Sequence, residues 1–161
     1  MRWPRTLVPL AAALVGGIAA QRAYRGLARF EVSEASMVPT LRPGDRVLTW
    51  ERPPVRGDIV VFEHPERPDF WMVKRVIGLP GEHVEITDGR VLVNGTSLDE
   101  PWTTDPTGPD ASWNLGPGEA IILGDARTLS AGDSRQIGPL HIDRLHRVVF
   151  ARYWPDPKAI T

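Results

Sequence analysis

Short apolar runs separated by turn-forming residues fill the chain from Phe30 onward, and this alternation constrains the fold more than any other feature. Sixteen prolines and fifteen glycines interrupt the chain so often that no long amphipathic helix fits after residue 30. Asp88-Gly89 separates two of the runs and is a strong signal for a tight β-hairpin. The chain is therefore expected to be mainly β, with strands at residues 46–50, 58–62, 70–77, 83–87, 90–93, 120–123 and 147–154.

The length of 161 residues suggests one domain, residues 30–161, behind a short N-terminal segment, residues 1–29. Within that domain, residues 99–119 are rich in Pro, Thr, Asp and Gly and are expected to form one long loop. A loop of this length in a small domain is either mobile or functional.

Residues 6–21 carry no charge and are bracketed by Arg5 and Arg22. Sixteen helical residues reach about 24 Å, which is short of the ~30 Å hydrocarbon core. Trp3 and the flanking arginines would extend that reach by snorkelling. We expect a single transmembrane anchor here, and the alternatives are a cleaved signal peptide and a buried or disordered tail.

Charge is distributed unevenly along the chain. Residues 1–30 hold five arginines and no acid, whereas residues 31–161 hold 14 basic and 20 acidic side chains. This short basic flank does not resemble a nucleic-acid-binding patch and is better suited to an anionic lipid surface. Counted alone, the arginines favour a cytoplasmic location for the body.

Several kinds of chemistry are disfavoured by composition. The chain has no cysteine, which excludes a thiol nucleophile, disulfide bonds and cysteine-ligated zinc. Its four histidines show neither a metal-binding spacing nor the order of a Ser-His-Asp triad. No metal or other cofactor is expected.

Lys74 stands out because the chain has only two lysines, Lys74 and Lys158, against seventeen arginines. Arginine stays protonated in proteins, whereas a desolvated lysine can lose its proton near neutral pH and act as a base. Lys74 shares an apolar strand face with Met72 and Val76. Taken singly, it would more simply be a surface lysine.

Ser36 precedes Met37-Val38-Pro39, where proline stiffens the backbone around the hydroxyl. An isolated serine is most often a solvated hydroxyl or a helix cap. Together, however, Ser36 and Lys74 are the two parts of a Ser-Lys dyad.

Four segments in order resemble those of type I signal peptidases: residues 36–41, 57–62, 74–82 and 124–135. The resemblance covers roughly residues 31–154 and implies a compact, largely antiparallel β fold. It also implies a serine endopeptidase that cleaves signal peptides from exported precursors. The protein would span the cell membrane once, with its catalytic domain on the extracytoplasmic side, against the charge signal above.

The same resemblance implies residue roles. Ser36 would be the nucleophile, and its backbone N–H would bind the oxyanion, while Lys74 would be the general base. The supporting residues would be Arg75, Asp125, Ser130, Asp133 and Arg135, with Asp125 paired to Arg75 and Ser130 orienting the lysine. Met37 and Pro39 are expected to contact the substrate.

Three departures from the family pattern keep alternatives open. Glu34 stands where many members carry Ser or Thr, Ala126 replaces the usual Asn, and the spacing to Asp133 is one residue longer. The alternatives are a processing peptidase dedicated to one or a few precursors and a catalytically silent relative that binds exported chains. In the expected loop, Trp102 and Trp113 either contact lipid or pack inside the protein.

Overall fold

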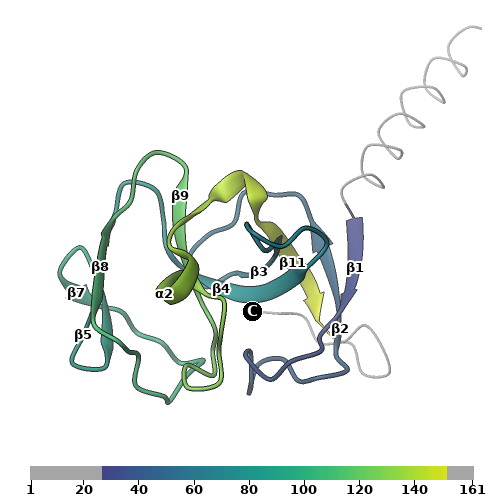
Figure 1. Cartoon of the computed structure of the whole chain (residues 1–161), viewed down its shortest axis with the longest axis horizontal. Coiled ribbons are helices and arrows are strands. Elements are labelled where there is room, and N and C mark those ends of the chain that lie inside the picture. Colours follow the sequence, from purple (N-terminus) through teal and green to yellow (C-terminus); the bar gives the residue numbers. More distant parts are fainter. Residues whose placement is uncertain (1–26, 152–161) are drawn as a thin grey trace, which may run out of the picture.

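Two antiparallel β-sheets form the described part of the chain, residues 27–151, in the computed structural model (Figure 1). The larger sheet has the strand order β1 (Leu27–Glu31), β2 (Arg46–Trp50), β11 (His146–Ala151), β3 (Ile59–Glu63), β4 (Trp71–Gly78), β9 (Glu119–Leu123) and β10 (Leu140–His141). The smaller sheet has the order β7 (Thr96–Ser97), β6 (Arg90–Val93), β5 (His83–Thr87) and β8 (Ala111–Asn114). A short helix, α2 (Ser134–Ile137), and a 3₁₀ turn, η1 (Ile142–Arg144), precede β11.

The expected strands are present. β2, β5 and β6 match their predicted bounds, β3 and β4 are shifted by one residue at both ends, and β9 begins one residue early. β11 begins one residue early, and residues 152–154 of its predicted span lie outside the described residues. The predicted hairpin joins β5 to β6, with Thr87 paired to Arg90 across Asp88-Gly89.

The prediction of one long loop over residues 99–119 is wrong, because Ala111–Asn114 forms β8 and pairs with β5. This segment has no run of β-branched or aromatic residues, so its strand conformation comes from pairing with a neighbour distant in sequence. β1 begins at Leu27, three residues ahead of the expected domain start, and pairs with β2 along its whole length.

Within residues 27–151, three apolar clusters make up the core, and the long strand β4 contributes to all of them. Val73 packs against a cluster around Met37 and Ile59, and Val76 belongs to a second cluster around Phe62. Ile77 belongs to a third cluster, which joins β4 and β9 to the smaller sheet. Because β4 runs between these clusters, side chains near its centre are excluded from water.

Trp102 and Trp113 pack against the third cluster, so the structure favours the packing alternative over lipid contact. The Trp102 ring also lies 4.5 Å from the Arg75 guanidinium carbon, a cation–π contact. The 99–110 segment therefore covers part of β4.

Within residues 27–151, no helix is long and apolar enough to cross a membrane. The predicted anchor, residues 6–21, lies outside the described residues.

Candidate active site

The Ser36 side chain lies on a tight loop between β1 and β2. Buried Met37 and Leu41 anchor this loop in the first core cluster, and Leu41 N–H donates to the Met37 carbonyl at 2.8 Å. The Ser36 carbonyl accepts a hydrogen bond from Ala126 N–H at 3.0 Å. Ser36 is therefore held by contacts at its own backbone, and it is 3% exposed.

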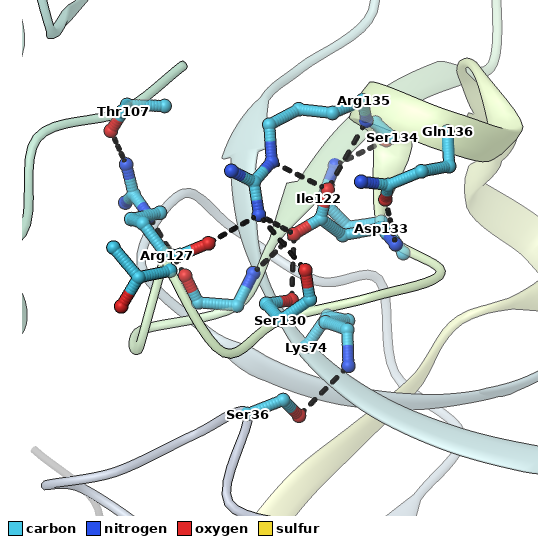
Figure 2. Close-up of polar contacts among 12 residues, drawn as sticks. Ser36, Lys74, Thr107, Ile122, Arg127, Ser130, Asp133, Ser134, Arg135 and Gln136 are labelled. Atoms are coloured by element: carbon cyan, nitrogen blue, oxygen red, sulfur yellow. Dashed lines mark hydrogen bonds and ion pairs between the residues drawn. The ribbon is translucent and has the colours of Figure 1, made fainter. Parts of the chain in front are cut away.

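Lys74 reaches Ser36 from the centre of β4, where it pairs with Val60 of β3. Its Nζ lies 2.9 Å from Ser36 Oγ (Figure 2). It also lies 3.1 Å from the Val73 carbonyl oxygen. Lys74 is 1% exposed, so the sequence expectation of an inward-facing, desolvated lysine is met. The contact joins a loop and a strand 38 positions apart.

Burial changes the protonation of this lysine. Desolvation lowers the pKa of Lys74 from 10.5 to about 8, although the nearby carboxylates of Asp133 and Glu34 raise it. An amine with a pKa near 8 is partly neutral at ordinary pH and can accept a proton from a hydroxyl group.

Asp133 is the centre of a buried polar network beside Lys74 (Figure 2). Its carboxylate accepts hydrogen bonds from Ser130 Oγ at 2.7 Å, from Gly124 N–H at 3.1 Å and from Arg135 Nη2 at 2.8 Å. Although burial raises the pKa of Asp133, these hydrogen bonds from Arg135 and Ser130 hold it below its ordinary value. Asp133 is thus a fixed negative charge near the ammonium group.

Asp133 also begins α2 as its N-cap and forms a capping box with Gln136. Gly132, which lies between Ser130 and this cap, has a φ of +67°, a backbone conformation that suits glycine. Ser130 and Asp133 meet despite the longer spacing. Ser130 donates to Asp133 and makes no hydrogen bond with Lys74, so any effect of Ser130 on the lysine acts through Asp133 or through packing.

A second buried ion pair fixes the loop that carries Ser36. Arg75 donates to Asp125 with Nε at 2.8 Å and with Nη2 at 2.6 Å, as the sequence led us to expect. Thr40 Oγ1 donates to the same carboxylate at 2.6 Å, and Arg75 Nη1 donates to the Gly57 carbonyl at 2.6 Å. This pair ties the Ser36 loop, β4 and the 124–127 segment together.

Sequence reasoning missed Arg127 and Thr40. Arg127 is 2% exposed, donates to the Gly124 carbonyl at 2.7 Å, and bonds Glu100 and Thr107 of the preceding loop. Thr40 lies within the 36–41 segment and Arg127 within the 124–135 segment, and this location inside the family-like segments is the signal that could have identified them. Their partners, however, are set by tertiary contacts.

A cavity of about 140 Å³ opens beside Ser36 and Lys74. Its walls are residues 30–34 and residues 70–74, and Val47 and Val61 also line it, as does Ser36. Met37 and Pro39, which we expected to contact substrate, do not line it: Met37 is wholly buried in the core, and Pro39 is exposed elsewhere on the loop. Among residues 27–151, no three His, Asp or Glu side chains gather as a metal site would require.

A family model described as signal peptidase, peptidase S26, matches residues 2–154. The chain belongs to this family. It is therefore a serine endopeptidase of the signal peptidase I type.

Individual peptidases are similar over most of the chain. A signal peptidase I from Leptolyngbya laminosa is 39% identical over 152 residues, 83% of this chain and 71% of that protein. Thylakoidal processing peptidase 1 of Arabidopsis thaliana is 35% identical over 144 residues, 79% of this chain and 42% of that protein. The crystal structure of a signal peptidase I from Enterococcus faecalis aligns with a TM-score of 0.53 at 30% identity, over 60% of this chain and 97% of that one.

Proposed function

We propose that this signal peptidase cleaves signal peptides from exported precursors with Ser36 as nucleophile and Lys74 as general base. The observation that carries the proposal is the 2.9 Å contact between Ser36 Oγ and a lysine amine that is 1% exposed. A serine hydroxyl is a weak nucleophile until a neighbouring base accepts its proton. Among the described residues, Lys74 is the one ionisable side chain hydrogen-bonded to Ser36.

Catalysis would proceed in two half-reactions. Neutral Lys74 takes the proton from Ser36 Oγ as this oxygen attacks the scissile carbonyl carbon. The protonated lysine then gives that proton to the leaving amine, and the precursor's N-terminal part stays on Ser36 as an ester. Water next attacks the ester while Lys74 accepts the water's proton; Lys74 returns this proton to Ser36 Oγ as the carboxylate product leaves.

The tetrahedral intermediates carry a negative oxygen that needs a hydrogen-bond donor. The Ser36 N–H donates no hydrogen bond within residues 27–151, so it is available for this oxygen. Glu34 cannot donate when it is ionised, and the proposal therefore assigns the oxyanion to the backbone.

The supporting residues act as positioning groups. Asp133, with Ser130 and Arg135 bound to it, lies where it would stabilise the lysine as it gains a proton. The Arg75–Asp125 pair would keep Thr40, and with it the Ser36 loop, at a constant distance from β4.

The cavity fits a narrow substrate. Its volume of about 140 Å³ is below the 300–1,000 Å³ range typical of pockets for drug-sized molecules. Its walls are β1 with the residues that follow it and the start of β4, and β1 is an edge strand of the larger sheet. An extended signal peptide with small side chains before the scissile bond would fit between these segments by main-chain hydrogen bonds.

Residues 6–21 would anchor the protein in the cell membrane as a single span, with residues 27–151 on the extracytoplasmic side. This arrangement would bring the catalytic domain to precursors that are still held in the bilayer by their signal peptides.

The test is cleavage of a precursor with an Ala-X-Ala site by the full chain in detergent, beside Ser36→Ala and Lys74→Arg. Arginine keeps the charge but supplies no base, so both variants are expected to lose activity. Ser97→Ala, an exposed hydroxyl change on the smaller sheet, is the matched control and should remain active. Activity retained in Lys74→Arg would reject Lys74 as the base.

An inactive wild type would point to one of the two alternatives. Trapping of native precursors on Ser36→Ala would then distinguish a dedicated processing peptidase, which binds few of them and cleaves those, from a silent relative, which binds without cleaving.

A further inference from the structure

Glu34 places an exposed negative charge at the substrate cavity. It lies two residues before Ser36, lines the same cavity as Ser36 and Lys74, and has an exposed side chain. Within residues 27–151, no hydrogen bond or ion pair holds its carboxylate. Its charge raises the pKa of the nearby Lys74, but no direct contact occupies the carboxylate oxygens, so they are available to a ligand.

The other acid of the cavity differs from Glu34 in this respect. Glu31 Oε2 lies 3.5 Å from Arg46 Nε on the neighbouring strand β2, so its charge is already partly balanced. Lys74 is the one basic side chain that lines the cavity, but it is buried and is hydrogen-bonded to Ser36 and to the Val73 carbonyl oxygen. The accessible charge next to the dyad is therefore negative.

We propose that Glu34 is a specificity-determining residue, selecting precursors with a basic side chain within two residues of the scissile bond and rejecting those with an acidic one. This inference rests on the proposed function, because it assumes that the scissile bond lies at Ser36. Since Glu34 is only two residues from Ser36, an extended substrate crossing the cavity brings its nearest side chains within reach of the carboxylate. Side chains further along would instead meet the aromatic wall that includes Phe70 and Trp71.

The expected difference in peptide affinity is small because the Glu34 side chain is exposed to solvent. A solvated ion pair is worth a small factor in affinity, and a like-charge contact costs a similar factor. A lysine peptide and a glutamate peptide of the same length are therefore expected to differ roughly three- to tenfold in Kd. This ratio should fall toward one at high salt because exposed charges are screened.

The experiment uses the full chain in neutral detergent with Ser36→Ala, so that binding is measured without turnover. The probes are fluorescent peptides with one Ala-X-Ala site and Lys, Gln or Glu at position −2, +1 or +2 from the scissile bond. Tighter binding of at least one lysine peptide over its glutamate partner, abolished by Glu34→Gln, is the expected result. Glu31→Gln is the matched control and should keep most of the preference, because its carboxylate is paired with Arg46.

Equal affinities of the charged peptides, a preference that survives Glu34→Gln, or no binding of any peptide would overturn the inference. Cleavage of the neutral peptide by the enzyme with Ser36 intact is scored separately and tests the proposed function. If the Ser36 enzyme cleaves the neutral peptide but no charge preference is found, only the proposed role of Glu34 is rejected. If Ser36→Ala binds the peptides with a preference that depends on Glu34, but the Ser36 enzyme does not cleave, only the proposed catalytic function is rejected.

Discussion

Replacing Lys74 with methionine tests whether burial of the ammonium group costs folding free energy. The fall of the pKa of Lys74 from 10.5 to about 8 is a difference of about 2.5, and each pKa unit is worth about 1.4 kcal/mol. The charged lysine therefore costs about 3 kcal/mol below pH 8. Methionine loses the hydrogen bonds to Ser36 and to the Val73 carbonyl oxygen, each worth about 1 kcal/mol. We expect Lys74→Met to be about 1 to 3 kcal/mol more stable than the wild type at pH 7.

The pH dependence is the sharper part of this prediction. Between about pH 8 and pH 10.5 the folded state binds fewer protons than the unfolded state, so wild-type stability rises with pH through this window. The advantage of Lys74→Met should consequently shrink by about 2 kcal/mol between pH 7 and pH 9.5. Other titrating groups cancel because they are common to both proteins.

The assay is urea unfolding of the full chain in detergent at both pH values, followed by tryptophan fluorescence. Ser36→Ala keeps the buried amine and serves as the control, since its stability should follow the pH dependence of the wild type. A stability difference between Lys74→Met and wild type that stays constant from pH 7 to pH 9.5 would refute the reasoning.

Three further predictions follow from the site. The kcat/KM for an uncharged peptide should rise with pH through about 8, as Lys74 becomes neutral. Glu34→Gln should move this rise to lower pH because the carboxylate raises the pKa of Lys74, and pH–rate profiles of the two proteins check both expectations. Asp125→Asn removes the anionic partner of the buried Arg75 and should cost about 3 kcal/mol in urea unfolding. Asp143→Asn changes a carboxylate that is 83% exposed and contacts the His141 ring, and it should change stability by less than about 0.5 kcal/mol. Gly124→Ala would place Cβ in a steric clash with Ser130 Oγ, so we expect at least about a tenfold loss of activity and a loss of about 1–3 kcal/mol of stability. Gly108→Ala, with open space around its Cβ position, should resemble the wild type in both assays.

Much of the fold was predictable because β-strands and tight turns have local signatures. Apolar runs gave β2, β5 and β6 their bounds, and Asp88-Gly89 predicted the hairpin between the last two. β8 was missed because its residues have no strand signature of their own and depend on β5 for pairing. β1 was missed for a related reason, since its mostly exposed residues are ordered by pairing with β2.

The sequence by itself determined the chemistry available to the site. One lysine in an apolar strand and one serine ahead of a stiffened backbone were identifiable as a potential pair, because residue type and local pattern are written in the chain. Only the tertiary structure decided that Lys74 and Ser36, 38 positions apart, lie within hydrogen-bond distance. It also decided that Met37 anchors the loop in the core, and that Ser130 contacts Asp133. These outcomes depend on strand pairing and on the clusters that exclude water, which involve residues too distant in sequence for any local pattern to specify.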